Sequence, residues 1–248
     1  MGLCEECYKA AVIIVTASTR CYTKCMDTAL LTALNVAHPR AIRKRTIVLY
    51  QGEVPRSGYF VKSGTLKVYR INRYGEEQIV GFRTRGELLP ETWLFGKTSS
   101  TLYYYEALED CELLSFDRRS FREAMDASSE LRDKLFGYLI NSHTSLLIQV
   151  TALNQSRAAD KLALMLFYLM YRYGHEEKPG EFHIELELTH TIIGSLIGVT
   201  RETMSVELGK LRKKGIIDYG SKHFVIHRHE LSRLLGDESF ADVSLLEP

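Results

Sequence analysis

The sequence lacks any apolar run long enough to cross a membrane. Its longest apolar stretches, Ala10–Val15 and Leu162–Met170, are much shorter than the roughly 20 residues that a membrane-spanning helix needs. Residues 1–15 also carry no basic segment ahead of their apolar run, which argues against a signal peptide. We therefore expect a cytoplasmic protein without a membrane partner.

The sequence also lacks the motifs of common catalytic sites. It contains no phosphate-binding Gly-x4-Gly-Lys segment, no recognisable nucleophile–base pair and no closely spaced metal-binding carboxylates. The net charge is only +1, and a composition of 45% hydrophobic and 25% charged residues is ordinary for a globular protein. We expect one large or two ordinary domains, and no enzyme.

A helix-turn-helix pattern is present near the C-terminus, in residues 188–219. Thr189 and Thr200 can cap two helices, because a threonine hydroxyl satisfies an otherwise unpaired backbone N–H. Gly198 lies between them, where the chain must turn sharply. The apolar residues of both segments recur at helical spacing, and they are Ile192, Ile193, Leu196, Ile197, Met204, Leu208 and Leu211. A helix pair around a short glycine-containing turn is typical of DNA-binding proteins.

The polar face of the second helix supports this interpretation. Residues 201–214 contain five basic residues against two glutamates, on a chain that is almost neutral. A helix in the major groove needs polar residues at its N-terminus to contact bases and basic residues to hold phosphates. The alternative is a solvated amphipathic helix with incidental charge. Residues 216–226 resemble a small hairpin, which would form a wing beside the second helix.

The rest of the chain divides by its patterns. Residues 1–39 look helical and irregular, whereas short β-type runs separated by glycines begin at residue 40 and indicate a sandwich or rolled sheet. Helical patterns return at Arg118. We predict four segments: a cysteine-containing N-terminus (1–39), a β-rich sensor domain (40–127), a long helix (128–155) and a DNA-binding domain (156–248). Residues 175–180 are predicted to be a linker or turn.

The long helix carries a heptad-like apolar seam. Its residues recur every three or four positions, and they are Leu131, Leu135, Leu139, Ser142, Leu146, Val150 and Leu153. A narrow seam of this kind favours association of two helices in a homodimer. The alternative is that the seam packs against the protein's own β-domain.

The order of these parts resembles the Crp/Fnr family of bacterial transcription regulators. The resemblance covers roughly residues 40–236 and rests on several segments, of which the most specific is 198–205 (GVTRETMS). It implies an α+β fold with a double-stranded, jelly-roll-like β-roll as the sensor domain, a long dimerisation helix and a C-terminal winged helix-turn-helix domain. It also implies double-stranded DNA with a palindromic operator, and RNA polymerase, as partners.

The family's DNA contacts can be carried over position by position. Arg201, Glu202 and Ser205 match base-reading positions, where arginine commonly binds guanine and glutamate accepts from cytosine. Val206 stands where many members have a second arginine, so the operator should differ at that base pair. His190 also stands where many members have arginine, which implies a weaker or pH-dependent phosphate contact. The remaining candidates would contact phosphates: Thr189, Thr200, Thr203, Lys213, Lys214, Lys222 and His223.

The effector site departs from the branch that binds cyclic AMP. Glu91 is kept, but Pro90 replaces a glycine, and Thr101 and Leu102 replace an arginine–serine pair that would neutralise a phosphate. These changes argue against conventional cyclic AMP binding. An apolar or aromatic ligand and a filled core both remain open. The candidate lining residues are Leu88, Glu91, Trp93, Thr101, Tyr103, Tyr105, His143, Leu146 and Leu147.

The five cysteines are odd in number, which argues against a disulfide framework. Cys4, Cys7, Cys21 and Cys25 invite comparison with the oxygen-sensing branch of the family, and four thiolates suffice for an iron–sulfur cluster or zinc. A thiol switch and plain structural cysteines are the alternatives. Cys111 is predicted to be a buried packing residue. The cofactor therefore remains open.

Together these observations predict a homodimeric DNA-binding regulator of the Crp/Fnr type. It would be controlled by an effector or redox signal other than cyclic AMP bound in the usual way. The alternative is a redox sensor built on the N-terminal cysteines, with altered DNA-binding specificity.

Overall fold

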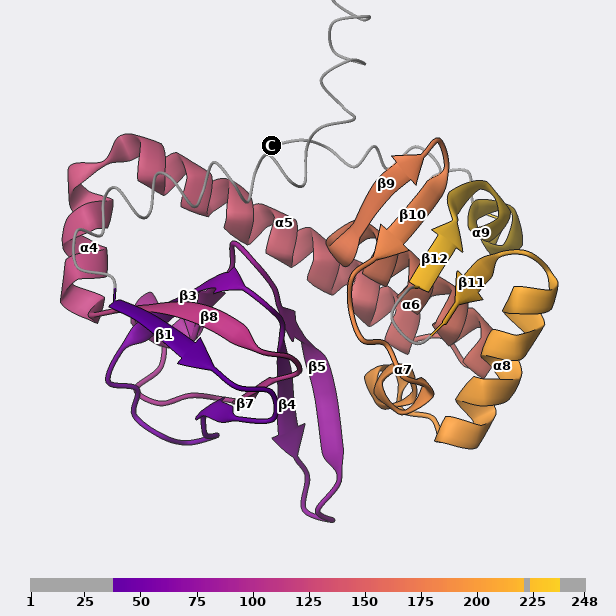
Figure 1. Cartoon of the computed structure of the whole chain (residues 1–248), viewed down its shortest axis with the longest axis horizontal. Coiled ribbons are helices and arrows are strands. Elements are labelled where there is room, and N and C mark those ends of the chain that lie inside the picture. Colours follow the sequence, from indigo (N-terminus) through magenta and orange to yellow (C-terminus); the bar gives the residue numbers. More distant parts are fainter. Residues whose placement is uncertain (1–37, 221–223, 237–248) are drawn as a thin grey trace, which may run out of the picture. The chain divides into compact units, whose positions relative to one another are not determined.

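The computed structural model describes residues 38–220 and 224–236, whose elements are labelled in Figure 1. These residues form two compact units, one of residues 38–138 and one that starts at residue 139. None of the described helices is both long and apolar enough to cross a lipid bilayer.

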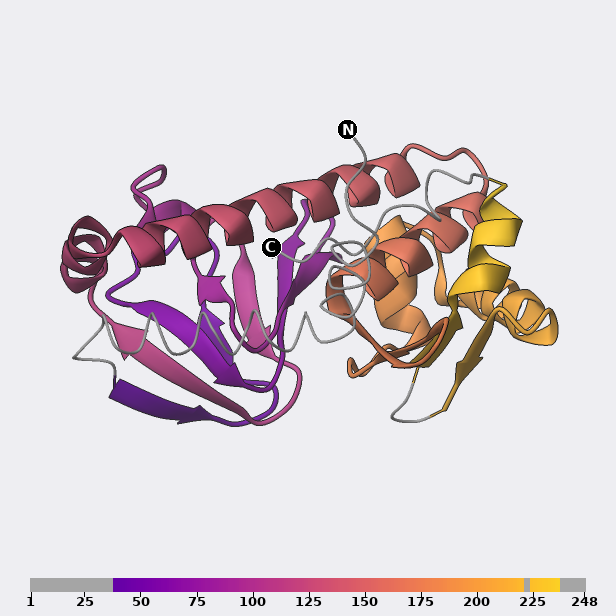
Figure 2. The same cartoon turned by 90° about the horizontal axis from the view of Figure 1, so that it is seen from above.

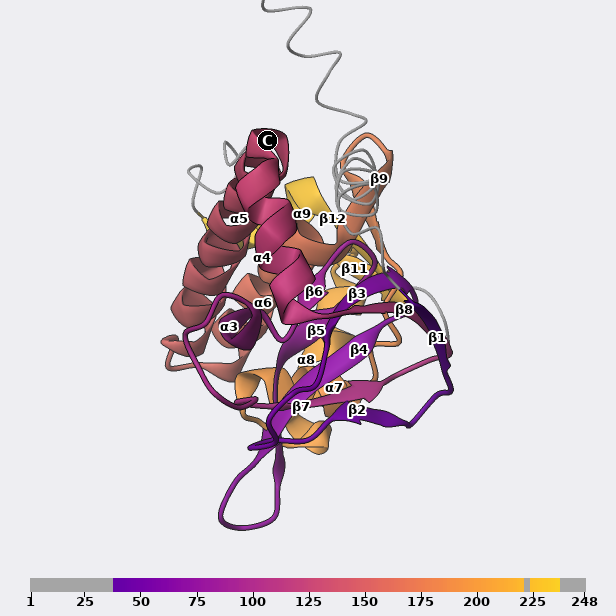
Figure 3. The same cartoon turned by 90° about the vertical axis from the view of Figure 1, so that its left-hand side faces the viewer.

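The first unit is a β-roll made of two antiparallel four-stranded sheets (Figure 3). The sheet orders are β1-β8-β3-β6 and β2-β7-β4-β5. The strands are β1 (His38–Ile42), β2 (Ile47–Leu49), β3 (Gly58–Ser63), β4 (Leu66–Ile71), β5 (Glu77–Arg83), β6 (Leu88–Leu89), β7 (Tyr104–Ala107) and β8 (Cys111–Phe116). Side chains from both sheets share one core, including Val61, Leu66, Val68, Tyr105 and Leu113. Burial of each such side chain stabilises the fold by roughly 1.5–3 kcal/mol.

Six of the eight strands, β2, β3, β4, β5, β7 and β8, lie in the region where short β-type runs separated by glycines are predicted. Two strands were not predicted. β1 begins at His38, so the expectation that residues 1–39 are helical and irregular is wrong at its end. β1 is mostly exposed and pairs only with β8, so it has no apolar alternation to detect. β6 has two residues, too few to show a period.

Two helices, α3 (Glu91–Leu94) and α4 (Arg118–Ala127), lie in this unit, and α5 (Ser129–Leu153) begins in it and continues into the second unit. α4 begins where Asp117 caps it, because the carboxylate accepts hydrogen bonds from the backbone N–H groups of Arg119 and Ser120. The bond from Arg119 is the main reason that the pKa of Asp117 lies below its ordinary value. α5 is one uninterrupted helix of 25 residues (Figure 2), close to the predicted 128–155.

The apolar seam of α5 is divided between two roles. Leu131 and Leu135 are fully buried inside the first unit, so the prediction that they belong to a dimer seam is wrong. Leu139, Leu146, Val150 and Leu153, in contrast, are at least 39% exposed. By their spacing in the sequence, all of these α5 residues lie on one stripe of the helix. Packing in the β-roll core determines which part of that stripe is buried.

The second unit carries the helix-turn-helix. Its elements after α5 are α6 (Ala158–Tyr173), β9 (Gly174–Lys178), β10 (Glu181–Ile184), α7 (His190–Ile197), α8 (Arg201–Lys213), β11 (Ile217–Tyr219), β12 (Phe224–His227) and α9 (Arg228–Leu235). The strands form one antiparallel sheet in the order β11-β12-β10-β9. All nine residues 162–170 of α6 are buried, so this helix forms the centre of the unit.

The expectation that residues 175–180 form a linker or turn is wrong for most of that segment. Residues up to Lys178 belong to β9, which pairs with β10 and places His175 opposite His183. The β9 sequence is Gly-His-Glu-Glu-Lys, which offers no apolar pattern. As an edge strand it is held by backbone hydrogen bonds to one neighbour, which a sequence pattern does not reveal.

Candidate nucleic-acid interface

The turn between α7 and α8 is built by local hydrogen bonds. Thr189 Oγ1 accepts from the N–H of Ile192 at 3.2 Å, and Thr200 Oγ1 accepts from the N–H of Thr203 at 3.3 Å. Gly198 ends α7 with a φ of 69°, in the left-handed region that favours glycine. Both predicted caps and the predicted glycine turn are thereby confirmed. Each cap stabilises its helix by roughly 1 kcal/mol.

α7 also packs closely against the turn that leads into α8. A Cβ added at Gly194 would lie 2.9 Å from the carbonyl oxygen of Val199, closer than real Cβ contacts. Met204, Leu208 and Leu211 are buried, as the spacing predicts, and they hold α8 against the unit. This packing determines which side of α8 faces outward.

The outward side of α8 carries the predicted base-reading residues. Arg201, Glu202, Thr203, Ser205 and Val206 are all exposed, and Val206 is 58% exposed. All five lie in the first two turns of the helix, the part that contacts base edges in helix-turn-helix proteins. Valine offers only apolar contact, such as with a thymine methyl group.

The basic residues of α8 fall into two groups. Lys210 pairs with Glu207 at 2.6 Å, and Arg212 pairs with Asp218 of β11 at 3.0 Å. Among the described residues, Arg201, Lys213 and Lys214 have no carboxylate partner. The positive charge that is free to meet an anion is therefore concentrated at the two ends of α8.

The wing is attached to both helices by ring contacts. Tyr219 of β11 meets His190 edge-on with ring centroids 5.5 Å apart, and it stacks on Phe224 of β12 at 5.7 Å. The guanidinium of Arg212 on α8 lies over the Tyr219 ring, 5.1 Å from its centroid. Sequence reasoning missed these links, because His190 and Tyr219 are far apart in the chain. Lys222 and His223 lie outside the described residues.

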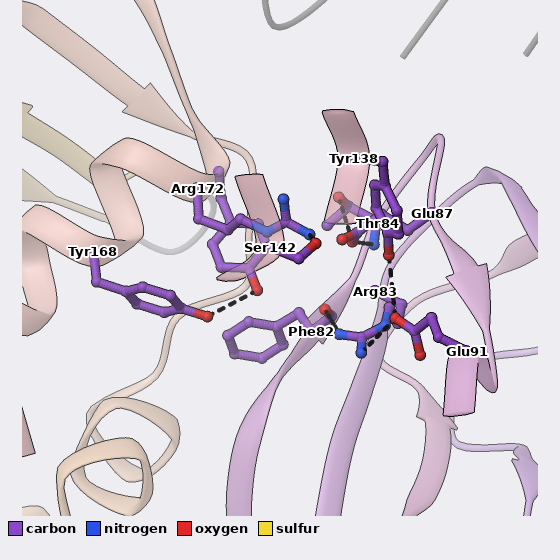
Figure 4. Close-up of polar contacts among 10 residues, drawn as sticks. Phe82, Arg83, Thr84, Glu87, Glu91, Tyr138, Ser142, Tyr168 and Arg172 are labelled. Carbon is purple, nitrogen blue, oxygen red and sulfur yellow. Dashed lines mark hydrogen bonds and ion pairs between the residues drawn. The ribbon is translucent and has the colours of Figure 1, made fainter. Parts of the chain in front are cut away.

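In the β-roll, Glu91 takes part in an internal polar network (Figure 4). Its Oε1 lies 2.8 Å from Nη2 of Arg83 on β5, and it accepts a hydrogen bond of 3.1 Å from the hydroxyl of Tyr138 on α5. The side chains of Arg83 and Glu91 are 22% and 18% exposed. Burial lowers the pKa of Arg83, but the attraction of Glu91 and its neighbours outweighs this and holds the pKa above its ordinary value. The carboxylate is thus occupied by the protein itself.

The other predicted effector residues lie mainly in the core of this unit. Leu88, Trp93, Thr101 and Tyr105 are buried, and the Thr101 hydroxyl donates to the carbonyl oxygen of Tyr50. Tyr103 packs at the edge of the same core. His143, Leu146 and Leu147 are exposed residues of the second unit. The burial supports the filled-core interpretation of the β-roll over a ligand cavity.

Four of the five cysteines, Cys4, Cys7, Cys21 and Cys25, lie outside the described residues. Cys111 is buried, as predicted, and its Sγ donates to the carbonyl oxygens of Thr65 and Glu109. Burial raises its pKa to about 11, so the thiol stays protonated at neutral pH. In the described part of the chain, no group of three or more His, Cys, Asp or Glu is arranged to hold a metal ion.

Two family models match the chain. The Cyclic nucleotide-binding domain covers residues 39–128, and the Crp-like helix-turn-helix domain covers residues 160–234. The two matched ranges correspond to the β-roll and to the unit that presents α8.

Curated relatives and solved structures agree with these matches. Regulatory protein HlyX of Actinobacillus pleuropneumoniae is 28% identical over 230 residues, which cover 86% of this chain and 94% of that protein. Electron transport regulator A of Shewanella oneidensis is 26% identical over 207 residues, which cover 83% and 82%. The structure of FixK2 from Bradyrhizobium japonicum matches with a TM-score of 0.67 at 23% identity and covers 80% of this chain and 97% of that one. At that identity the structural likeness concerns the fold.

Proposed function

Because this chain belongs to the Crp/Fnr family of bacterial transcription regulators, we propose that it acts as a homodimer on a palindromic operator. It is a helix-turn-helix regulator that binds DNA, and its family is one of regulators rather than enzymes. We further propose that RNA polymerase is a partner of the homodimer and that the protein binds its DNA in the cytoplasm.

The observation that carries the proposal is the outward face of α8. Arg201 is exposed and has no ion-pair partner among the described residues, while Thr200 holds the helix start in place. A guanidinium presented in this way can bind guanine O6 and N7 together. Lys213 and Lys214 at the other end of α8 are available for phosphates.

The dimer is supported by the exposed stripe of α5. Its apolar residues are each between 39% and 66% exposed, and they are Phe136, Leu139, Ile140, Leu146, Leu147, Val150 and Leu153. A continuous apolar stripe on a helix surface marks an interaction site. A second copy of the same helix would cover it, and the symmetric pair would match a palindromic site.

The controlling signal is proposed not to be cyclic AMP held in the usual way. The family's nucleotide carboxylate, Glu91, is bonded to Arg83 and Tyr138 instead, and Thr101 and Leu102 supply no cation for a phosphate. The signal would reach the protein elsewhere. Cys4, Cys7, Cys21 and Cys25 remain the candidates for an alternative in which an iron–sulfur cluster, zinc or a thiol switch senses redox state.

Selection from random duplex DNA tests the function as a whole. The full chain is purified without oxygen, and selection is run before and after oxidation. We expect an enriched sequence with two inverted half-sites, because a two-fold dimer presents two copies of α8. Enrichment of a single half-site would contradict the dimer, and no enrichment in either redox state would contradict the proposal.

Replacing Arg201 with alanine tests the base contact. We expect a loss of roughly 1–3 kcal/mol at one base pair per half-site, with relaxed preference at that pair. Fluorescence anisotropy on operators substituted at each position measures it. Lys213→Ala is the matched control, because loss of a phosphate contact weakens all sequences alike. If Arg201→Ala also weakened every operator uniformly, Arg201 would contact only phosphate.

A further inference from the structure

Two arginines of α4 form a cationic pair that the proposed function does not use. Arg118 and Arg122 are four residues apart, so they lie on the same face of the helix. Gly96, in the loop after α3, shows how close they come: a Cβ added there would lie 2.8 Å from Nη2 of both side chains. Two guanidinium groups therefore converge on one point at the surface of the β-roll.

Within the described ranges, no carboxylate pairs with Arg118 or Arg122, although Arg119, between them, binds Glu123 at 2.8 Å. The Nε atom of Arg118 is buried and has no hydrogen-bond partner there. Like charges at this spacing destabilise a helix, and a buried N–H without an acceptor is also destabilising. An anion bound between the two Nη2 atoms would remove the repulsion between the like charges.

The surroundings determine what kind of anion fits. The guanidinium of Arg118 lies over the ring of Trp93, with Cζ 5.0 Å from the ring centroid, a cation–π contact that helps to position the side chain. The positive φ of Gly96, 76°, keeps the loop free of a side chain beneath the pair. The loop continues as Lys97-Thr98-Ser99-Ser100, which adds a cation and three hydroxyl groups nearby in sequence. Guanidinium groups match the oxygen geometry of phosphate.

We propose that Arg118 and Arg122, above Gly96 and beside Trp93, form a binding site for a phosphate group. The phosphate is either free or carried as a monoester by a small metabolite. The site is separate from Glu91 and from the DNA-reading face. An anion there would tie the loop after α3 to α4, which leads through Ser128 directly into α5.

The only tryptophan of the chain makes the site directly observable. Trp93 is buried and lies under Arg118, so an anion that binds the Arg118 guanidinium changes the environment of the indole ring. Tryptophan fluorescence of the full chain is followed while inorganic phosphate, or glycerol phosphate as a monoester, is added at constant ionic strength. Sodium chloride at the same ionic strength is the reference. The measurement involves no DNA, so its outcome is independent of the regulatory function.

A saturable fluorescence change is expected with phosphate and not with chloride. Arg122→Gln should weaken binding at least tenfold, and Arg118→Gln should abolish the signal, while Arg119→Gln, one residue away and already paired, should leave binding unchanged. Tighter binding of the monoester would identify a metabolite rather than free phosphate. Equal responses to chloride and phosphate, equal losses in Arg119→Gln and Arg122→Gln, or no saturable change would overturn the proposal.

Discussion

Replacing Leu146 and Leu147 together with glutamate should lower the affinity for a palindromic operator at least a hundredfold. Both side chains are 54% exposed on the α5 stripe, so the folded chain tolerates the change. Four carboxylates brought together across the proposed dimer seam would repel one another and separate the copies. A lone copy loses the second half-site, and linked half-sites typically add two to four orders of magnitude in affinity.

Sedimentation and DNA anisotropy on the same samples measure this effect. Leu102→Glu is the control, because Leu102 is 47% exposed but belongs to the loop before β7 and not to α5. It should remain dimeric and bind DNA normally. A double variant that stays dimeric and keeps its affinity would show that the α5 stripe is not the dimer seam.

Replacing Arg83 with methionine should lower the free energy of unfolding of the β-roll by about 3 kcal/mol. The change leaves the largely buried Glu91 carboxylate, 18% exposed, with the hydroxyl of Tyr138 as its one remaining side-chain donor among the described residues. Removing one partner of a buried pair is costly, whereas replacing both by apolar residues is often neutral. The double variant Arg83→Met with Glu91→Leu should therefore be more stable than Arg83→Met alone.

Urea unfolding followed by Trp93 fluorescence reports on this unit, since Trp93 lies in it and is the only tryptophan. Arg119→Met is the matched control, because Arg119 and Glu123 are 85% and 62% exposed. An exposed pair of this kind contributes at most about 1 kcal/mol. Equal stability of Arg83→Met and the unmodified protein, or a double variant that loses more than the single one, would contradict the role assigned to this pair.

Much of the fold was predictable, and the exceptions share a cause. β3, β4 and β8 were recognised because most of their residues pack in the core, which gives each strand a short run of mainly apolar residues. β1 and β9 are edge strands with polar residues, and backbone hydrogen bonds to one neighbour hold them. Backbone groups are the same in every residue, so pairing of this kind leaves little trace in a sequence.

The DNA-reading helix also combines features that the sequence predicts with features that only the fold determines. Its caps, its glycine turn and its buried face depend on residues within four positions of each other, and the sequence alone determined them. The sequence also showed five basic residues between positions 201 and 214, but not which of them are free. Only the folded chain brings Asp218 to Arg212.

By itself, then, the sequence determined the order of the parts, the helix-turn-helix and its family. Tertiary structure alone decided that Leu131 and Leu135 are core while Leu146 and Leu147 are surface, and that Glu91 is bonded to Arg83 and Tyr138. The reason is physical. Helix caps and periodic burial arise between near neighbours in the chain, whereas the burial of a stripe and the partner of a charge depend on distant segments that only folding brings together.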